Sequence, residues 1–156
     1  MSELALRLIE ENKKTRSKFL DLRNCDLTEV PEEIGDLAWL ESLFLSGEWW
    51  VNDFDIVWEY NRLSQQITRN SGNFNTIKSL PETFQNLSNL KILLLSGSPI
   101  SDLKVLEKLT SLCLIDCSST LVFDLSPVIA LVKKNIPVFY FERYGSSDIG
   151  IYRCQN

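Results

Sequence analysis

The stretch that spans residues 48–74 carries four carboxylates among tryptophans, and three of them are Asp53, Asp55 and Glu59. Two of them, such as Asp53 and Asp55, or either of these with Glu59, have the chemistry of the acid–base pairs that cleave sugar bonds. Three of the four tryptophans lie in the same stretch: Trp49, Trp50 and Trp58. Nothing in the sequence fixes the separation of the carboxylates. A carbohydrate-active enzyme that uses these insertion carboxylates is therefore a less favoured alternative to a non-catalytic protein.

The chain contains no histidine, which narrows its chemistry further. Ser–His–Asp and Cys–His nucleophiles, histidine-ligated zinc and the commonest general base are excluded. No phosphate-binding glycine loop, dinucleotide pattern or calcium loop is present. The cysteines are Cys25, Cys113, Cys117 and Cys154, and their spacing fits no paired zinc pattern. We expect reduced, buried thiols, and we predict no catalytic residue, no metal and no cofactor.

Charge and hydropathy limit the partners of the chain. It has 16 basic and 21 acidic residues and a net charge of -5, which argues against a nucleic-acid partner and against a polybasic membrane contact. No apolar run approaches the roughly 18 residues of a membrane span. Residues 1–4 lack a basic region followed by an apolar stretch, so no signal peptide is predicted and the expected location is cytoplasmic.

One phrase of sequence occurs twice and predicts a repeated structure. Its first half, which begins at Leu20, recurs 23 residues later at Leu43. Its second half, which begins at Leu27, recurs 50 residues later at Ile77. The two offsets differ by 27 residues, so residues 48–74 are an insertion inside one repeat. A period of 20 to 29 residues with this leucine spacing is typical of solenoids, which usually serve as binding surfaces.

The pattern also predicts the individual elements. We expect a helix over residues 3–12 that covers the open end of the repeats, followed by four short strands. Ser126 and Pro127 are typical of a helix start, residues 136–141 read as a last strand, and a frayed tail is expected from Tyr144. Side chains on alternate strand positions are predicted to point inward: Leu20 and Leu22, Leu43 and Leu45, Leu93 and Leu95, Ile115 and Cys117.

These residues resemble the leucine-rich repeat family over about residues 17–141. The family pattern Leu-x-x-Leu-x-Leu-x-x-(Asn/Cys)-x-Leu recurs in register in four repeats. The Val30-Pro31 segment and its second copy are similar to the bacterial intracellular Leu-Pro type, which occurs in multidomain signalling proteins. The resemblance implies an α/β fold, a leucine-rich repeat solenoid with a short parallel concave sheet, an N-terminal capping helix and one long insertion.

The resemblance also implies a domain organisation and a function. One domain is expected over residues 1–156, with an N-terminal cap over 1–16, repeats over 17–125 and a C-terminal cap over 126–156. Family members mostly bind other proteins along the concave strands, so the expected function is protein binding as a signalling scaffold. One departure concerns the family's asparagine ladder, whose position holds four different residues here: Cys25, Asn75, Ser98 and Thr120.

Apolar residues at the outward strand positions predict a partner site on the concave face, because contiguous exposed apolar area often marks an interface. The candidates are Phe19, Phe44, Ile92, Leu94 and Leu114. Two alternatives stay open at this point. The insertion or the terminal strands could cover these side chains, or the register could be misassigned.

The insertion is the second candidate for a partner site. Aromatic side chains on a loop are typical of interface hot spots, which makes Trp49, Trp50 and Trp58 predicted partner contacts. The alternative is that these rings pack on the repeats and anchor the loop. The predicted partner is another protein, with no nucleic acid and no membrane. Self-association as a structural or regulatory subunit, in a homodimer, is the alternative.

Overall fold

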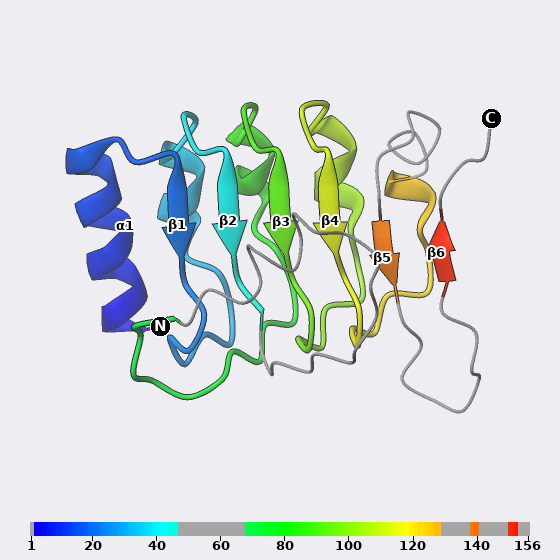
Figure 1. Cartoon of the computed structure of the whole chain (residues 1–156), viewed down its shortest axis with the longest axis horizontal. Helices are drawn as coiled ribbons and strands as arrows, with labels where there is room; N and C mark the ends of the chain where they lie inside the picture. Colours follow the sequence, from blue (N-terminus) through cyan, green and yellow to red (C-terminus); the bar gives the residue numbers. More distant parts are fainter. Residues whose placement is uncertain (1, 47–67, 129–137, 141–149, 153–156) are drawn as a thin grey trace.

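The sheet consists of six short strands that lie side by side in chain order (Figure 1). The computed structural model describes residues 2–46, 68–128, 138–140 and 150–152. The strands β1 to β5 are parallel, and β6 is antiparallel to β5. Their bounds are β1 (Phe19–Asp21), β2 (Ser42–Phe44), β3 (Ile92–Leu94), β4 (Leu114–Asp116), β5 (Val138–Tyr140) and β6 (Gly150–Tyr152).

Short 3-10 helices lie behind the sheet and close the core from that side (Figure 1). They are η1 (Glu32–Asp36), η2 (Glu82–Asn86), η3 (Lys104–Lys108) and η4 (Ser126–Val128). Each contributes buried apolar side chains, such as Ile34 in η1 and Phe84 in η2, to one core cluster. A parallel sheet of this kind, with helices on one face and at one end, makes the protein an α/β protein.

The strand residues alternate between this core and the opposite face, as the sequence predicts. All eight predicted inward side chains are buried in the core cluster: Leu20, Leu22, Leu43, Leu45, Leu93, Leu95, Ile115 and Cys117. Neighbouring strands are paired without slippage, because Leu20 lies opposite Leu43 and Leu43 lies opposite Leu93. A one-residue slip would turn this apolar set to the other face, so the core fixes the register.

Helix α1 (Glu3–Thr15) covers the β1 end of the sheet (Figure 1). The Ser2 side chain accepts a hydrogen bond from the first turn, and Arg16 ends the helix in the left-handed region at φ 54°. The helix is three residues longer than predicted. The Asn12 side-chain amide donates to the Phe19 carbonyl at 3.1 Å and accepts from the Trp39 indole at 3.0 Å. This buried polar contact joins the last turns of the helix to β1.

The chain returns from the insertion along the turn that follows β1. The Gly72 N–H donates to the Asn24 carbonyl at 3.0 Å, and the Thr76 N–H donates to the Leu27 carbonyl at 2.7 Å. Gly72 has to be glycine at this approach, since a Cβ there would lie 2.6 Å from the Asn24 carbonyl oxygen. The repeat pattern therefore resumes at residue 75 in the predicted register.

Asn75 is the residue that restores the register. Its side-chain oxygen accepts from the backbone N–H groups of Cys25 and Leu27 at 3.2 and 3.1 Å. Its side-chain nitrogen donates to the carbonyls of Leu22 and Leu45 at 2.8 and 3.0 Å. Asn75 is 1% exposed, so these four bonds satisfy backbone groups that water does not reach.

The equivalent positions in the next two turns hold shorter side chains, which make fewer hydrogen bonds to the backbone than Asn75 does. The Thr120 hydroxyl donates to the Cys117 carbonyl at 2.7 Å, within its own turn. The Ser98 hydroxyl is fully buried and makes no hydrogen bond. The asparagine bridge between neighbouring turns is therefore made at one position of the described repeats, as the sequence departure at Cys25, Ser98 and Thr120 predicts.

The C-terminal part corrects one expectation. The sequence predicts a frayed tail from Tyr144, yet Gly150–Tyr152 forms β6 and pairs antiparallel with β5, while the rest of the predicted tail lies outside the described residues. The predicted last strand over residues 136–141 is present as β5, and the predicted helix start at Ser126 is the 3-10 helix η4. A reversed strand is outside the leucine periodicity, so the repeat pattern carries no signal for it.

Replacing Asn75 by alanine is expected to lower the free energy of unfolding by about 3 kcal/mol or more, because four buried backbone groups lose their partners. The matched control is Ser98→Ala at the equivalent position, which removes a hydroxyl without a partner and is expected to be neutral or stabilising. Urea unfolding followed by circular dichroism measures both. Equal losses for the two variants would contradict the role of Asn75.

Candidate functional site

The sheet face opposite the 3-10 helices carries the outward strand residues that the sequence singles out. We call it the front face, because the strands lie in front of the 3-10 helices in Figure 1. Strand pairing arranges its side chains in two rows that cross the sheet. One row is Phe19, Ser42, Ile92 and Leu114, and the other is Asp21, Phe44, Leu94 and Asp116.

Three of the five predicted patch residues are buried, which corrects the expectation of an exposed apolar patch. Phe44, Leu94 and Leu114 are 0%, 3% and 7% exposed. They are also absent from the core cluster behind the sheet, so they are buried on the front face. Burial of these three apolar side chains is favourable because it removes them from contact with water. Phe19 is 38% exposed, and Ile92 is partly exposed.

Phe44 is held by two side chains of the first repeat. The Phe19 ring meets it edge to face, with centroids 5.0 Å apart and an interplanar angle of 85°. The Arg23 guanidinium lies 5.1 Å from the centre of the Phe44 ring. Arg23 in turn donates two hydrogen bonds to the Asp21 carboxylate, from Nε at 2.9 Å and from Nη2 at 2.8 Å. This bidentate pair fixes the cation over the ring.

The other end of the row is closed by a second carboxylate. Asp116 is 1% exposed, and its Oδ1 accepts hydrogen bonds from the Ser118 backbone N–H at 3.0 Å and from the Ser118 hydroxyl at 2.5 Å. Buried charges in proteins need such partners. In the second row of the front face, Phe44 and Leu94 therefore lie between two carboxylates, Asp21 and Asp116, that both have hydrogen-bond partners.

Side chains just before the strands form a charged row beside the exposed part of this face. Glu41 pairs with Lys18 at 2.6 Å and with Lys91 at 2.7 Å. These hydrogen bonds, first from Lys18 and then from Lys91, lower the pKa of Glu41 to about 2. The two lysines are 72% and 51% exposed. We call this region the exposed strip, and it consists of Lys18, Phe19, Glu41, Ser42, Lys91 and Ile92.

Sequence reasoning missed the charged half of the exposed strip. Its signal was available, because Lys18, Glu41 and Lys91 each stand one residue before a strand and alternate in charge. Opposite charges on neighbouring strands attract. Arg23 was also missed, since its role depends on contacts with Asp21 and Phe44 that no periodicity reports.

The insertion candidates lie outside the described residues. This applies to the predicted partner contacts Trp49, Trp50 and Trp58, and to the carboxylates Asp53, Asp55 and Glu59. Their roles stay predictions. Within the part that the structure describes, no group of three Cys, Asp or Glu side chains is placed to hold a metal ion.

The three cysteines of the described residues differ in exposure, which corrects the expectation of a buried thiol at Cys113, and Cys154 lies outside the described residues. Cys25 and Cys117 are buried, whereas Cys113 is exposed at the turn before β4. Burial raises the pKa of both Cys25 and Cys117 to about 12, and the nearby carboxylates of Asp21 and Asp116 add to this effect. Both thiols are therefore protonated at neutral pH and poor nucleophiles.

Comparison with known proteins adds no identification. A scan against protein-family models matches no family, and a search of curated proteins finds no similar sequence. In the described ranges, no helix combines the length and apolar character that crossing a membrane requires.

Truncation of Phe44 is expected to destabilise the fold. Phe44→Ala removes a fully buried ring and should lower the free energy of unfolding by about 3–5 kcal/mol. Phe19→Ala, the matched control on the same face, removes a ring that is 38% exposed and should cost less than about 2 kcal/mol. Chemical denaturation measures both values, and a Phe44→Ala variant as stable as wild type would refute burial of the row.

The charged row makes a prediction about Glu41. Lys91→Gln removes one of its two cationic partners, so the pKa of Glu41 should rise from about 2 toward its ordinary 4.5. Because the pKa is depressed in the folded state, this contribution to stability is present above pH 4.5 and is lost as the pH falls toward 2. Carboxyl NMR titration measures the shift.

The control for this titration is Lys78→Gln, which removes an exposed lysine that pairs with no carboxylate in the described part of the chain. It should leave the Glu41 titration unchanged. An unchanged Glu41 pKa in Lys91→Gln as well would show that the ion pair does not persist in solution.

Proposed function

We propose that the chain is a leucine-rich repeat solenoid that acts as a non-catalytic protein-binding module. The observation that carries this proposal is the register of the repeats. Equivalent residues of successive repeats lie opposite one another in parallel strands, and each of the first four strands leads into a 3-10 helix that faces the core. Stacked repeats of this kind present extended rows of side chains, which suit recognition of another protein.

The exposed strip is the part of the front face that we assign to the partner. Phe19 and Ile92 supply partly exposed apolar surface on β1 and β3. The ammonium groups of Lys18 and Lys91 stand beside it, held by Glu41. A central apolar contact with a charged rim is the usual composition of a protein interface. Phe44, Leu94 and Leu114 are buried beside this surface on the same face of the sheet.

We place this module in the cytoplasm. Cys25 and Cys117 are buried thiols in the core, which fits a reducing compartment. The partner is a protein, and the tryptophans Trp49, Trp50 and Trp58 remain predicted additional contacts. A signalling role, as in the family that the repeats resemble, is part of the same proposal.

The test is affinity capture from the source cell with mass spectrometry, comparing wild type with the double variant Phe19→Ser, Ile92→Asp. Both changes fall on side chains with solvent exposure, so the fold should persist, which circular dichroism checks. The partner captured by wild type should be lost by the variant. A titration with the purified partner should then show a loss in affinity of about 100-fold, on the order of 2–3 kcal/mol.

The matched control is Leu121→Ser, Phe123→Ser, which removes exposed apolar side chains from a turn away from the strip. It should capture the same partner with the affinity of the wild type. Equal affinity of the strip variant and the wild type would overturn the assignment of the exposed strip.

A further inference from the structure

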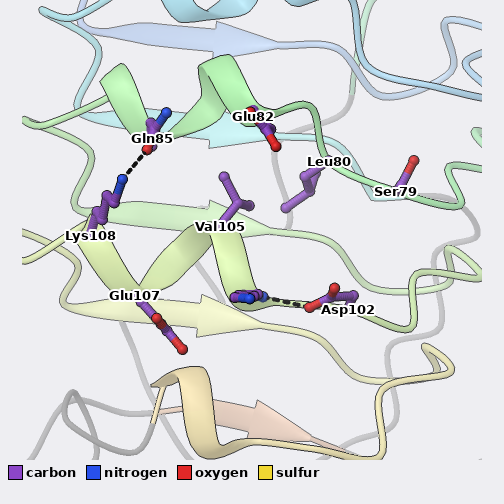
Figure 2. A pocket seen from close by; sticks show the side chains of 9 residues that line it. Ser79, Leu80, Glu82, Gln85, Asp102, Val105, Glu107 and Lys108 are labelled. Carbon is purple, nitrogen blue, oxygen red and sulfur yellow. Dashed lines mark hydrogen bonds between the residues drawn. The ribbon is translucent and has the colours of Figure 1, made fainter.

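A groove lies on the opposite side of the molecule from the front face, between η2 and η3 (Figure 2). Its volume is about 410 Å³. It is lined by side chains from both 3-10 helices and from the segments that lead into them: Ser79, Leu80, Glu82, Gln85, Asp102, Lys104, Val105, Glu107 and Lys108.

The interface between η1 and η2 is packed more tightly. A Cβ at Gly35 would lie 2.6 Å from the Thr83 Cβ, so the two turns already touch there. The Thr83 hydroxyl also donates to the Glu32 carbonyl at 2.8 Å and joins the two helices. The η1–η2 interface is therefore closed at this point, whereas the η2–η3 interface carries the groove.

The entry into η3 explains why the groove opens at this place. Pro31 and Pro81 precede η1 and η2 with extended backbones, at ψ 141° and 156°. Leu103 precedes η3 at φ -111° and ψ 10°, and it is buried in the core. The chain thus turns inward before η3, and Leu80 of the preceding repeat is left only partly buried at the bottom of the groove.

The lining combines an apolar floor with carboxylates. Leu80 and Val105 are partly buried and form the floor, and Figure 2 shows them between Glu82 and Asp102. No ion pair in the described residues uses Glu82 or Asp102. One oxygen of Asp102 accepts from the Lys104 backbone N–H at 2.7 Å, which holds this carboxylate at the groove.

One of the two basic side chains that line the groove is bonded to a neutral partner at one end. The Lys108 ammonium donates to the Gln85 side-chain oxygen at 2.5 Å and bridges the two helices at one end of the groove (Figure 2). The lining as a whole carries three carboxylates and two ammonium groups, which disfavours an anionic ligand such as a phosphate. A cationic group with an aliphatic stem matches both the floor and the carboxylates.

We propose that this groove binds an arginine side chain presented by an extended segment of a partner protein. The methylene stem lies on Leu80 and Val105, and the guanidinium lies between the carboxylates of Glu82 and Asp102. Arginine fits better than lysine, because its planar fork donates in several directions at once. This site goes beyond the proposed function, which uses the front face, and it gives the protein a second contact on its other side.

The probe for this proposal is the peptide acetyl-Leu-Arg-Leu-amide, titrated into nitrogen-15-labelled protein and followed by NMR. Saturable shifts are expected at the backbone amides of Leu80, Glu82, Asp102 and Val105. The same peptide with citrulline in place of arginine keeps the shape and removes the charge, and it should bind about tenfold more weakly. Added salt should weaken the arginine peptide alone, because screening acts on the charged pair.

Variants locate the binding site. Glu82→Gln and Asp102→Asn should each weaken the arginine peptide about three- to tenfold. Glu29→Gln is the matched control, since it removes the same charge from the equivalent segment before η1 and should leave binding unchanged. The strip variant Phe19→Ser, Ile92→Asp should also bind the peptide normally, which separates this test from that of the proposed function.

Three outcomes would overturn the proposal. They are equal binding of the citrulline peptide, an equal effect of Glu29→Gln and Glu82→Gln, and shifts that map to the exposed strip in place of the groove. The absence of saturable shifts at millimolar peptide would overturn it as well.

Discussion

The side chain of Asn75 bonds backbone groups that lie up to 53 residues before it in the sequence, and the alignment of the first two repeats depends on it. It bonds the turn after β1 at Leu22, Cys25 and Leu27, and it reaches Leu45 at the end of β2. Buried backbone groups at these turns have no access to water, so an amide that both donates and accepts is well suited to them. The next two turns rely on apolar packing with less help from side-chain hydrogen bonds.

The two faces of the sheet are buried for different reasons. Behind the sheet, leucines from strands and 3-10 helices form one continuous core. On the front face, Phe44 is buried beside Phe19 and beneath Arg23, whose charge is matched by Asp21. Such a layer combines apolar area with charges that retain their partners, so it is stable without being part of the core. What remains exposed at its edge is a small surface with a defined charge pattern.

The periodicity of the sequence was enough to predict the strands, their register and the inward side chains, because core burial repeats along the chain. It was also enough to predict that the pattern resumes after the insertion. It could not predict the burial of Phe44, Leu94 and Leu114, because alternation tells which face a residue occupies and not what covers that face. The β6 strand and the groove beside Leu80 were missed for a related reason, since each arises where the chain departs from the repeat.

The return of the chain at Asn70 to Thr76 has a consequence for how this protein tolerates change. The Asn70 amide donates to the carbonyls of Asp21 and Arg23 at 3.0 and 2.8 Å, so the returning chain is fastened before the repeat resumes. The part of the repeat that follows the insertion is therefore aligned by contacts that the returning chain itself makes. Since the entropy of closing a loop grows only slowly with its length, a longer segment between Ser46 and Asn70 adds little to the entropic cost of closing this loop. This segment is therefore an insertion site, because the hydrogen bonds that fasten the returning chain at Asn70 lie outside it.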